Sequence, residues 1–436
     1  MAETAESGPD RERETGFERV TLGDLEPARS RHMWTRSAVH ATDDLLVAGR
    51  WDGTVSAYGA ESLESRWTVT HPDHAVGIDS FGSDDEAEPN AGGDAIVVAG
   101  RGKTGTIAAY DAETGDRRWR YDTADDVGTA DRDSIFYLPY VVALETDAGD
   151  GRLYAAARRY ERDGETRRWH STVYAFDADG SVRWTYETDA SPIAIDLDAA
   201  GDRLAVGYNR CMGDHDTGLV VLEADSGTPE WTWDPGTEGD RRVGDVSFDG
   251  DSIAVASHGD KRGYVLGRRG AERWSVDLAV ETGIDGERLY AYPNHALATD
   301  GRVAFVTGNT YANASRETAN RHPNEHRIAV FDDESGGELL WDADVYGFVH
   351  GIAVDDGTIV TPCAQNFRVR DPETHAVRWF DLESGDGNCE RFDGIATAAT
   401  AVDGTVAAIE EPVEYHDDGE TRGEYALRVG SLEMTR

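Results

Sequence analysis

The sequence has few cysteines, almost no lysine and no long apolar segment. Its 436 residues include three cysteines, Cys211, Cys363 and Cys389, an odd number without Cys-x-x-Cys spacing, which argues against a disulfide framework. Lys103 and Lys261 are the two lysines, so 40 of the 42 basic residues are arginine. Neither a secretory signal nor an apolar run of about 18 residues, the length of a membrane-spanning helix, is evident. We therefore expect a cytoplasmic protein without membrane insertion.

Acidic residues outnumber basic ones. The chain carries 85 Asp and Glu side chains and a formal net charge of -43. We interpret this charge mainly as the solvated surface of a protein from a salt-rich, halophilic cytosol. Nucleic-acid binding is disfavoured, because affinity for a polyanion comes largely from Lys and Arg contacts to phosphate. The 39% hydrophobic content is sufficient for a folded core.

A short pattern that ends in tryptophan recurs along the chain. The clearest copy is "AAYDAETGDRRW" at residues 108–119, with related copies at 56–67, 174–184, 220–231, 265–274, 329–341 and 368–379. Between copies lie short runs rich in Val, Ile, Ala and Tyr, bounded by Gly and Asp, which indicate strands joined by turns. Four strands per unit, repeated, are typical of a β-propeller.

Eight tryptophans end such units and are expected to dock neighbouring blades. They are Trp34, Trp67, Trp119, Trp184, Trp231, Trp274, Trp341 and Trp379. Their mean spacing of about 49 residues fits blade-sized repeats. The last apolar runs supply three strands without a tryptophan, so we expect the N-terminal strand to complete the final blade. The sequence thus predicts an all-β, eight-bladed propeller of four-stranded antiparallel blades. It forms one domain over residues 17–436, after a disordered acidic tail at residues 1–16.

The residues of the clearest copy have structural roles. Gly115 tolerates the positive φ of a tight turn between the third and fourth strands, and Asp111 and Thr114 can bond turn amides. Trp119 is expected on the outer strand, where it buries a large ring between blades. Ala109 leaves room for the neighbouring ring.

This pattern resembles the tryptophan-docking repeat of the pyrroloquinoline-quinone (PQQ) propeller superfamily. The resemblance covers residues 30 to 432 and is carried by the five residues of the clearest copy. The superfamily includes quinoprotein alcohol dehydrogenases and the outer-membrane β-barrel assembly lipoprotein. For the dehydrogenases it implies PQQ, a calcium ion and a vicinal cysteine pair. The three cysteines here are not adjacent, so we expect no PQQ.

Strand order divides the loops between two faces. The turns between strands one and two and between strands three and four are short and acidic. Loops between strands two and three, and the links between blades, carry most of the His and Cys residues and two insertions, residues 157–170 and 308–326. This asymmetry points to the second, loop-rich face as the functional one.

Some loop residues have spacings that could hold a metal. His71 and His74, and His322 and His326, are paired at short spacing, and imidazole suits several transition metals. Cys211 and His215 share a further loop. The alternative for each set is a solvated or structural loop side chain, because spacing without helix or Cys support is weak evidence.

Other residues are expected near the centre of this face. His295 and His350 begin two consecutive inner strands, and Tyr137 and Tyr140 enter from a link. They could contact a flat ligand, or pack the rim. An arginine-rich stretch at 157–170 could dock an acidic partner, although a solvated hairpin is the simpler interpretation.

These observations rank three functions. The first is a non-catalytic platform whose loop-rich face binds a protein partner or a small ligand. The second is a redox or accessory protein that holds a metal or a tetrapyrrole with loop-face histidines, by analogy with the eight-bladed haem d1 enzymes. A quinone-dependent dehydrogenase ranks last, and no complete catalytic set is evident, so we lean against an enzyme.

Overall fold

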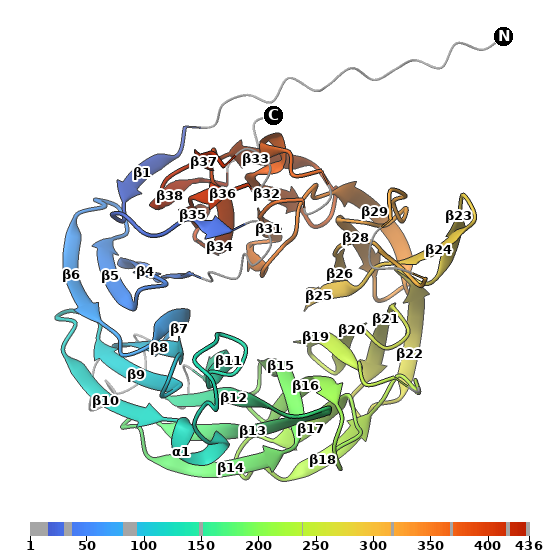
Figure 1. The fold of residues 1–436 in the computed structure, drawn as a ribbon, viewed down its shortest axis with the longest axis horizontal. Helices are drawn as coiled ribbons and strands as arrows, with labels where there is room; N and C mark the ends of the chain where they lie inside the picture. The colour runs from blue at the N-terminus through green and yellow to red at the C-terminus, as the bar shows by residue number, and fades with distance from the viewer. Residues whose placement is uncertain are drawn as a thin grey trace.

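The computed structural model describes residues 16–29, 37–81, 94–147, 151–237, 239–314, 318–366, 369–415 and 419–432. These segments are mostly antiparallel strands arranged around a ring (Figure 1). The expected fold class, an all-β propeller, is confirmed. Trp34 and residues 1–15 of the expected tail lie outside the described residues.

Sheet pairing gives eight four-stranded units among the described residues, which we number as blades in chain order. Blade 1 comprises β3 (Ala38–Ala41), β4 (Leu45–Gly49), β5 (Thr54–Gly59) and β6 (Ser65–Thr70), and blade 2 comprises β7 (His74–Phe81), β8 (Ala95–Arg101), β9 (Thr106–Asp111) and β10 (Arg117–Asp122). Blade 3 comprises β11 (Tyr140–Asp147), β12 (Arg152–Asp163), β13 (Thr166–Asp177) and β14 (Val182–Thr188), and blade 4 comprises β15 (Ala190–Leu197), β16 (Arg203–Cys211), β17 (Leu219–Glu223) and β18 (Pro229–Trp233).

Blade 5 comprises β19 (Val243–Asp249), β20 (Ser252–Ser257), β21 (Arg262–Gly267) and β22 (Glu272–Asp277), and blade 6 comprises β25 (Pro293–Thr299), β26 (Arg302–Thr307), β28 (Arg327–Asp332) and β29 (Glu338–Asp344). Blade 7 comprises β30 (Ala353–Asp355), β31 (Thr358–Cys363), β32 (Ala376–Asp381) and β33 (Gly387–Arg391), and blade 8 comprises β34 (Ile395–Val402), β35 (Thr405–Glu411), β38 (Ala426–Ser431) and β1 (Glu18–Thr21). Blades 2 and 3 share one sheet through a single pair, Tyr140 with Arg101.

Blade 8 combines both ends of the described chain. Strand β1 pairs antiparallel with β38, from Glu18 opposite Val429 to Thr21 opposite Ala426. Figure 1 shows β1 (blue) beside β38 (red). The strand that completes this blade is therefore Glu18–Thr21, which precedes Trp34, the tryptophan that we expected to end this unit.

Smaller elements decorate the ring. They are α1 (Ala124–Val127), η1 (Pro372–Thr374), a sheet of β2 (Ala28–Arg29), β36 (Val413–Glu414) and β37 (Thr421–Arg422), and a sheet of β23 (Thr282–Ile284), β24 (Glu287–Tyr290) and β27 (Tyr311–Ala312). Within the described segments, no helix is long and apolar enough to cross a bilayer.

Six tryptophans occupy the same place between blades. They are Trp67, Trp119, Trp184, Trp231, Trp274 and Trp341. Each lies on the outer strand of its blade, over a glycine in the strand 3–4 turn of the next blade. A Cβ atom on that glycine would lie 2.5 to 2.9 Å from the ring. Four of the six also donate from Nε1 to a backbone carbonyl in the same turn, at 2.8 to 3.1 Å.

Trp379 differs from our expectation. It lies on β32, the third strand of blade 7, and not on the outer strand. The true turn of this blade follows Asp381, and the residue four positions after Gly385 is Cys389 on β33. We aligned the copy one strand too early, because "RDPETH" resembles a turn but its Pro372–Thr374 segment forms a short 3-10 helix before β32. Trp379 is fully buried and stacks on Phe17 at 5.9 Å.

The innermost strands are joined by side chains rather than by a shared sheet. Asp245 Oδ2 accepts a hydrogen bond from the amide of Ala296 at 3.1 Å, and Asp249 Oδ2 accepts one from Gly301 at 2.8 Å. Asp196 accepts from the amide of Phe248 in the same way. Carboxylates of one blade thus satisfy edge amides of the next, which would otherwise lack a ladder partner.

Candidate functional site

The loop-rich face is formed by the loops between second and third strands and by the links between blades. His71 lies in the β6–β7 link and His74 begins β7. The His71 ring is buried, and its Nδ1 donates to the Asp73 carbonyl at 3.0 Å. The His74 ring stacks on Trp51 at 3.9 Å, and its Nδ1 bonds the Trp51 carbonyl. Burial lowers the pKa of both rings. The His71 ring therefore fastens its own link, and the His74 ring holds the β4–β5 loop of blade 1.

Cys211 and His215 meet at one backbone oxygen. His215 Nε2 donates to the Thr217 carbonyl at 2.9 Å, and Cys211 Sγ donates to the same oxygen at 3.4 Å. Burial raises the pKa of the Cys211 thiol to about 12, so the thiolate that a metal prefers is disfavoured. The pair closes the β16–β17 loop.

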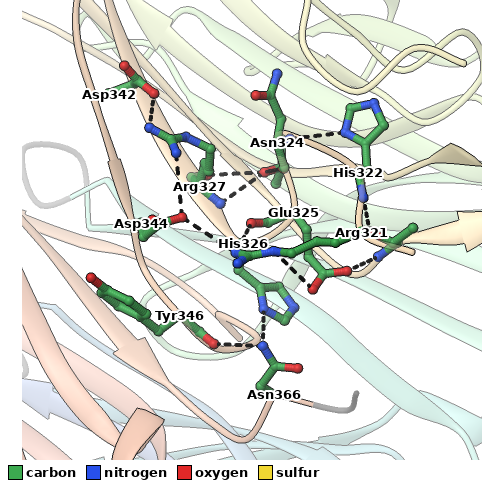
Figure 2. A network of polar contacts seen from close by, with 12 residues as sticks. Arg321, His322, Asn324, Glu325, His326, Arg327, Asp342, Asp344, Tyr346 and Asn366 are labelled. Atoms are coloured by element: carbon green, nitrogen blue, oxygen red, sulfur yellow. Dashed lines mark hydrogen bonds and ion pairs between the residues drawn. The ribbon is translucent and has the colours of Figure 1, made fainter. Parts of the chain in front are cut away.

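His322 and His326 hold the long β26–β28 insertion, but they point to different partners (Figure 2). His322 Nε2 donates to the Val280 carbonyl at 3.0 Å, and its Nδ1 accepts from the Asn324 amide at 3.1 Å. His326 Nε2 donates to Asn309 Oδ1 at 2.9 Å, and its Nδ1 accepts from Asn366 Nδ2 at 3.2 Å. Both nitrogens of each ring are used within the chain.

Ion pairs complete the network around this insertion. Figure 2 shows Arg327 between Asp342 and Asp344, and Arg321 between Asp344 and Glu325. Glu325 is buried, and its Oε2 accepts from the amide of Thr310 at 3.0 Å. The network fixes the shape of the insertion on the loop-rich face.

His295 and His350 lie near each other at the inner rim. His295, on β25, donates from Nε2 to the carbonyl of Val349, the residue before His350, at 2.9 Å. Its Nδ1 lies 3.4 Å from Asp245 Oδ2. The His350 ring meets Phe348 edge-on at 5.1 Å. His295 therefore links blades 5, 6 and 7.

The donor sets do not fit a metal ion held by three side chains or the PQQ site of the dehydrogenases. Among the residues that the structure describes, no group of three His, Cys, Asp or Glu side chains is arranged to hold a metal ion. Cys211, Cys363 and Cys389 are buried in blades 4 and 7, and none is adjacent to another. The vicinal pair of the quinoprotein dehydrogenases has no counterpart, and we derive no redox step.

Tyr137 and Tyr140 belong to a continuous stack of arginines and aromatic rings on the loop-rich face of blades 2 and 3. Its members, in order, are Arg101, Tyr140, Arg158, Trp169, Tyr160, Tyr137 and Arg132. Successive separations lie between 4.6 and 5.4 Å. We call this set the Arg–aromatic stack.

The sequence had not indicated Arg101 and Arg132 as part of this surface. Arg101 ends the second strand of blade 2 and donates from Nη2 to the Ile135 carbonyl at 2.7 Å. Arg50 stands at the same point of blade 1 and bonds the Leu22 and Asp24 carbonyls. The repeated "VAGR" of residues 47–50 and 98–101 is the signal that could have identified this position.

The β12–β13 hairpin presents the stack. Both strands have 12 residues, and pairing places Tyr160 opposite Trp169 and Arg162 opposite Arg167. Side chains directly opposite each other share one side of a hairpin, so this side is basic and aromatic. Trp169 Nε1 has no acceptor within the described part of the chain.

A cleft of about 430 Å³ opens elsewhere on the same face, beside η1, β33 and β37. Its lining includes Arg391, which pairs with Glu373 at 2.7 Å, and Arg422, which pairs with Glu420 at 3.3 Å. The charges of this cleft are thus largely balanced within the chain.

The family model described as "Outer membrane protein assembly factor BamB" matches residues 18–167 and 150–380. The chain belongs to this BamB family. The match agrees with the PQQ-like repeat recognised in the sequence. Comparison of the sequence with curated proteins gives no match.

Solved propellers share the fold of this BamB-family chain at low identity. BamB from Moraxella catarrhalis is 17% identical, with a TM-score of 0.54 and coverage of 91% of this chain and 94% of that one. Quinohemoprotein alcohol dehydrogenase from Comamonas testosteroni is 13% identical, with a TM-score of 0.57 and coverage of 92% and 75%. Sqt1 from Saccharomyces cerevisiae is 12% identical, with a TM-score of 0.60 and coverage of 97% and 100%. These similarities show the fold alone.

Proposed function

We propose that this protein is a non-catalytic docking platform, whose loop-rich face binds a partner protein in a salt-rich cytosol. The Arg–aromatic stack carries the proposal. Tyr, Trp and Arg are the residues enriched at the energetic centres of protein interfaces. Their rings and guanidinium groups bring large contact areas with little conformational freedom to lose.

Exposed apolar side chains on the same face support this function. Phe136, next to the stack, is 56% exposed, and Tyr346 in the β29–β30 link is 48% exposed. The matching family model is named after a protein assembly factor, and this name favours a scaffold function over an enzymatic one. His71, His215, His322 and His326 hold loops of this face through hydrogen bonds within the chain, so the face is a preformed surface.

Site-directed cross-linking in the native cell tests the proposal. A photoreactive phenylalanine replaces Phe136 or Tyr346 on the loop-rich face. It replaces Leu339 or Val182 as matched controls, since both are exposed beside the strand 3–4 turns of the opposite face. We expect the two loop-face positions to capture the same partner and the controls to capture none. Capture from the control positions alone, or from no position, would overturn the proposal.

A further inference from the structure

Two arginines from consecutive blades meet on the loop-rich face. Arg210 lies near the end of β16, and Arg241 lies in the link that leads to β19. An isolated antiparallel bridge joins their backbones, so their Cα atoms are about 5 Å apart. Arg167, on the β13 strand of the hairpin, is close enough to Arg210 to repel its charge.

No ion pair links Arg167, Arg210 or Arg241 to an acidic side chain in the segments that the structure describes. Neighbouring Arg242, in contrast, pairs with Asp234 at 2.9 Å. Such an absence is unexpected in a chain with twice as many acidic as basic residues.

Burial, followed by the charge of Arg241, lowers the pKa of Arg210. Arg167 adds to this repulsion, and the nearby Tyr292 and Asp240 oppose it. Like charges held together without a partner destabilise one another, and a bound anion would remove that cost.

Aromatic rings hold Arg241 in place. Its guanidinium carbon lies 4.7 Å from the centre of the Tyr292 ring. Tyr292 in turn packs edge-on against Tyr290 at 5.5 Å and Tyr311 at 5.4 Å. Lys261 adds a cation 5.1 Å from the Tyr290 ring. The surface is thus both cationic and aromatic, and it continues from the Arg–aromatic stack through the hairpin.

We propose that Arg210 and Arg241, with Arg167 at the edge, bind the carboxylate side chains of an acidic segment of the partner protein. This inference rests on the proposed docking function and names the chemistry that the partner presents. The planar fork of each guanidinium suits a carboxylate, which accepts two parallel hydrogen bonds.

Charge complementarity favours an acidic segment as the occupant. The net charge of -43 repels anions from most of the surface, so this unpaired cluster is where an acidic chain meets attraction. A segment long enough to pass from Arg241 to Arg167 also reaches Trp169 and Tyr160 on the same side of the hairpin. A free oxyanion would gain the charge contacts without the aromatic ones.

Fluorescence anisotropy of a short labelled peptide of alternating Glu and Ser tests this site on the purified full chain. The test variant is Arg210→Ser with Arg241→Ser. The control is Arg183→Ser with Arg268→Ser, which removes the same charge from arginines that pair with Asp177 and Asp251 away from the loop-rich face. Thermal unfolding of each variant verifies that it is folded at the assay temperature.

We expect the test variant to bind the peptide about tenfold more weakly or worse, and the control to match the wild type within about twofold. Equal losses in both variants would show a long-range charge effect and overturn the site. If inorganic phosphate binds the wild type and the peptide does not, the acidic-segment proposal is also overturned, and the cluster is a site for a free oxyanion. The cross-linking experiment separates the two proposals. If the Arg210→Ser, Arg241→Ser variant still captures the partner through a photoreactive residue at position 136, the proposed docking function stands and only the acidic-segment site is contradicted.

Discussion

The indole ring of Trp119 lies directly over Gly180 of the next blade. A Cβ atom at Gly180 would lie 2.6 Å from that ring, and Trp119 Nε1 donates to the Ala178 carbonyl at 2.9 Å. A tryptophan ring lies over a turn glycine in the same way at five further blade boundaries. Blades 2 to 7 are therefore each positioned by the preceding blade through one large ring and one missing side chain.

The variant Gly180→Ala tests this contact. Gly180 has a φ of 84°, so alanine meets both backbone strain and the Trp119 ring. We expect a loss of about 2 to 4 kcal/mol in the free energy of unfolding. The control Gly164→Ala has a φ of 59° with no atom within 4 Å, so only the strain of about 1 to 2 kcal/mol remains. Equal losses in chemical denaturation would contradict the docking contact.

The repeat was predictable from sequence where the motif is intact, and not where it varies. Leu63 occupies the turn position that glycine takes in other blades, with a φ of 53°. The neighbouring outer strand there is β1, which contributes Val20 rather than tryptophan to the shared cluster. Leu63 packs in the same cluster, so a larger side chain is tolerated where no large ring docks. In blade 7, Cys389 at the tryptophan position similarly concealed the true outer strand.

Phe17 takes part in joining the N-terminal segment to blade 7. Its ring stacks on the buried Trp379 at 5.9 Å and meets Phe392 edge-on at 6.5 Å. We expect Phe17→Ala to lower the free energy of unfolding by about 2 to 4 kcal/mol. Phe136→Ala, at an exposed position, should change it by less than about 0.5 kcal/mol. An unchanged denaturation midpoint for Phe17→Ala would mean that this contact contributes little.

The three thiols should be protected from reagents. Cys211, Cys363 and Cys389 are all buried. Burial raises the pKa of Cys211 to about 12 and raises that of Cys363, so both stay protonated at pH 8. We expect slow reaction of the native protein with a disulfide reagent at pH 8, and rapid reaction of all three thiols after unfolding. Fast stoichiometric labelling of native Cys211 would show that the β16–β17 loop opens.

Asp196 should make stability depend on pH. Burial first, and then Asp245 and Asp198, raise its pKa to about 7. The folded chain then binds a proton that the unfolded chain releases near pH 4, so this group's contribution falls as pH rises from 4 to 7. Asp196→Asn keeps an acceptor for the Phe248 amide without the charge. We expect its stability advantage over the wild type to grow between pH 5.5 and 7 and then to level off. An advantage that does not change with pH would contradict the raised pKa.

The candidate site was predicted as a face rather than as residues. Strand order was enough to collect the histidines and insertions on one side. It could not show that His322 and His326 use their ring nitrogens within the chain, because partners such as Val280, Asn309 and Asn366 lie in segments distant in sequence. The unpaired state of Arg210 was equally hidden, since counter-ions are a property of the folded surface.

Amide hydrogen exchange of the full chain, with and without the acidic peptide, tests the central claim most directly. The account predicts slower exchange in the link at 123–139, the hairpin tip at 160–169 and the segment at 239–242, with no change in the strand 3–4 turns of the opposite face. Slower exchange confined to those turns, or no change anywhere on the loop-rich face, would contradict it.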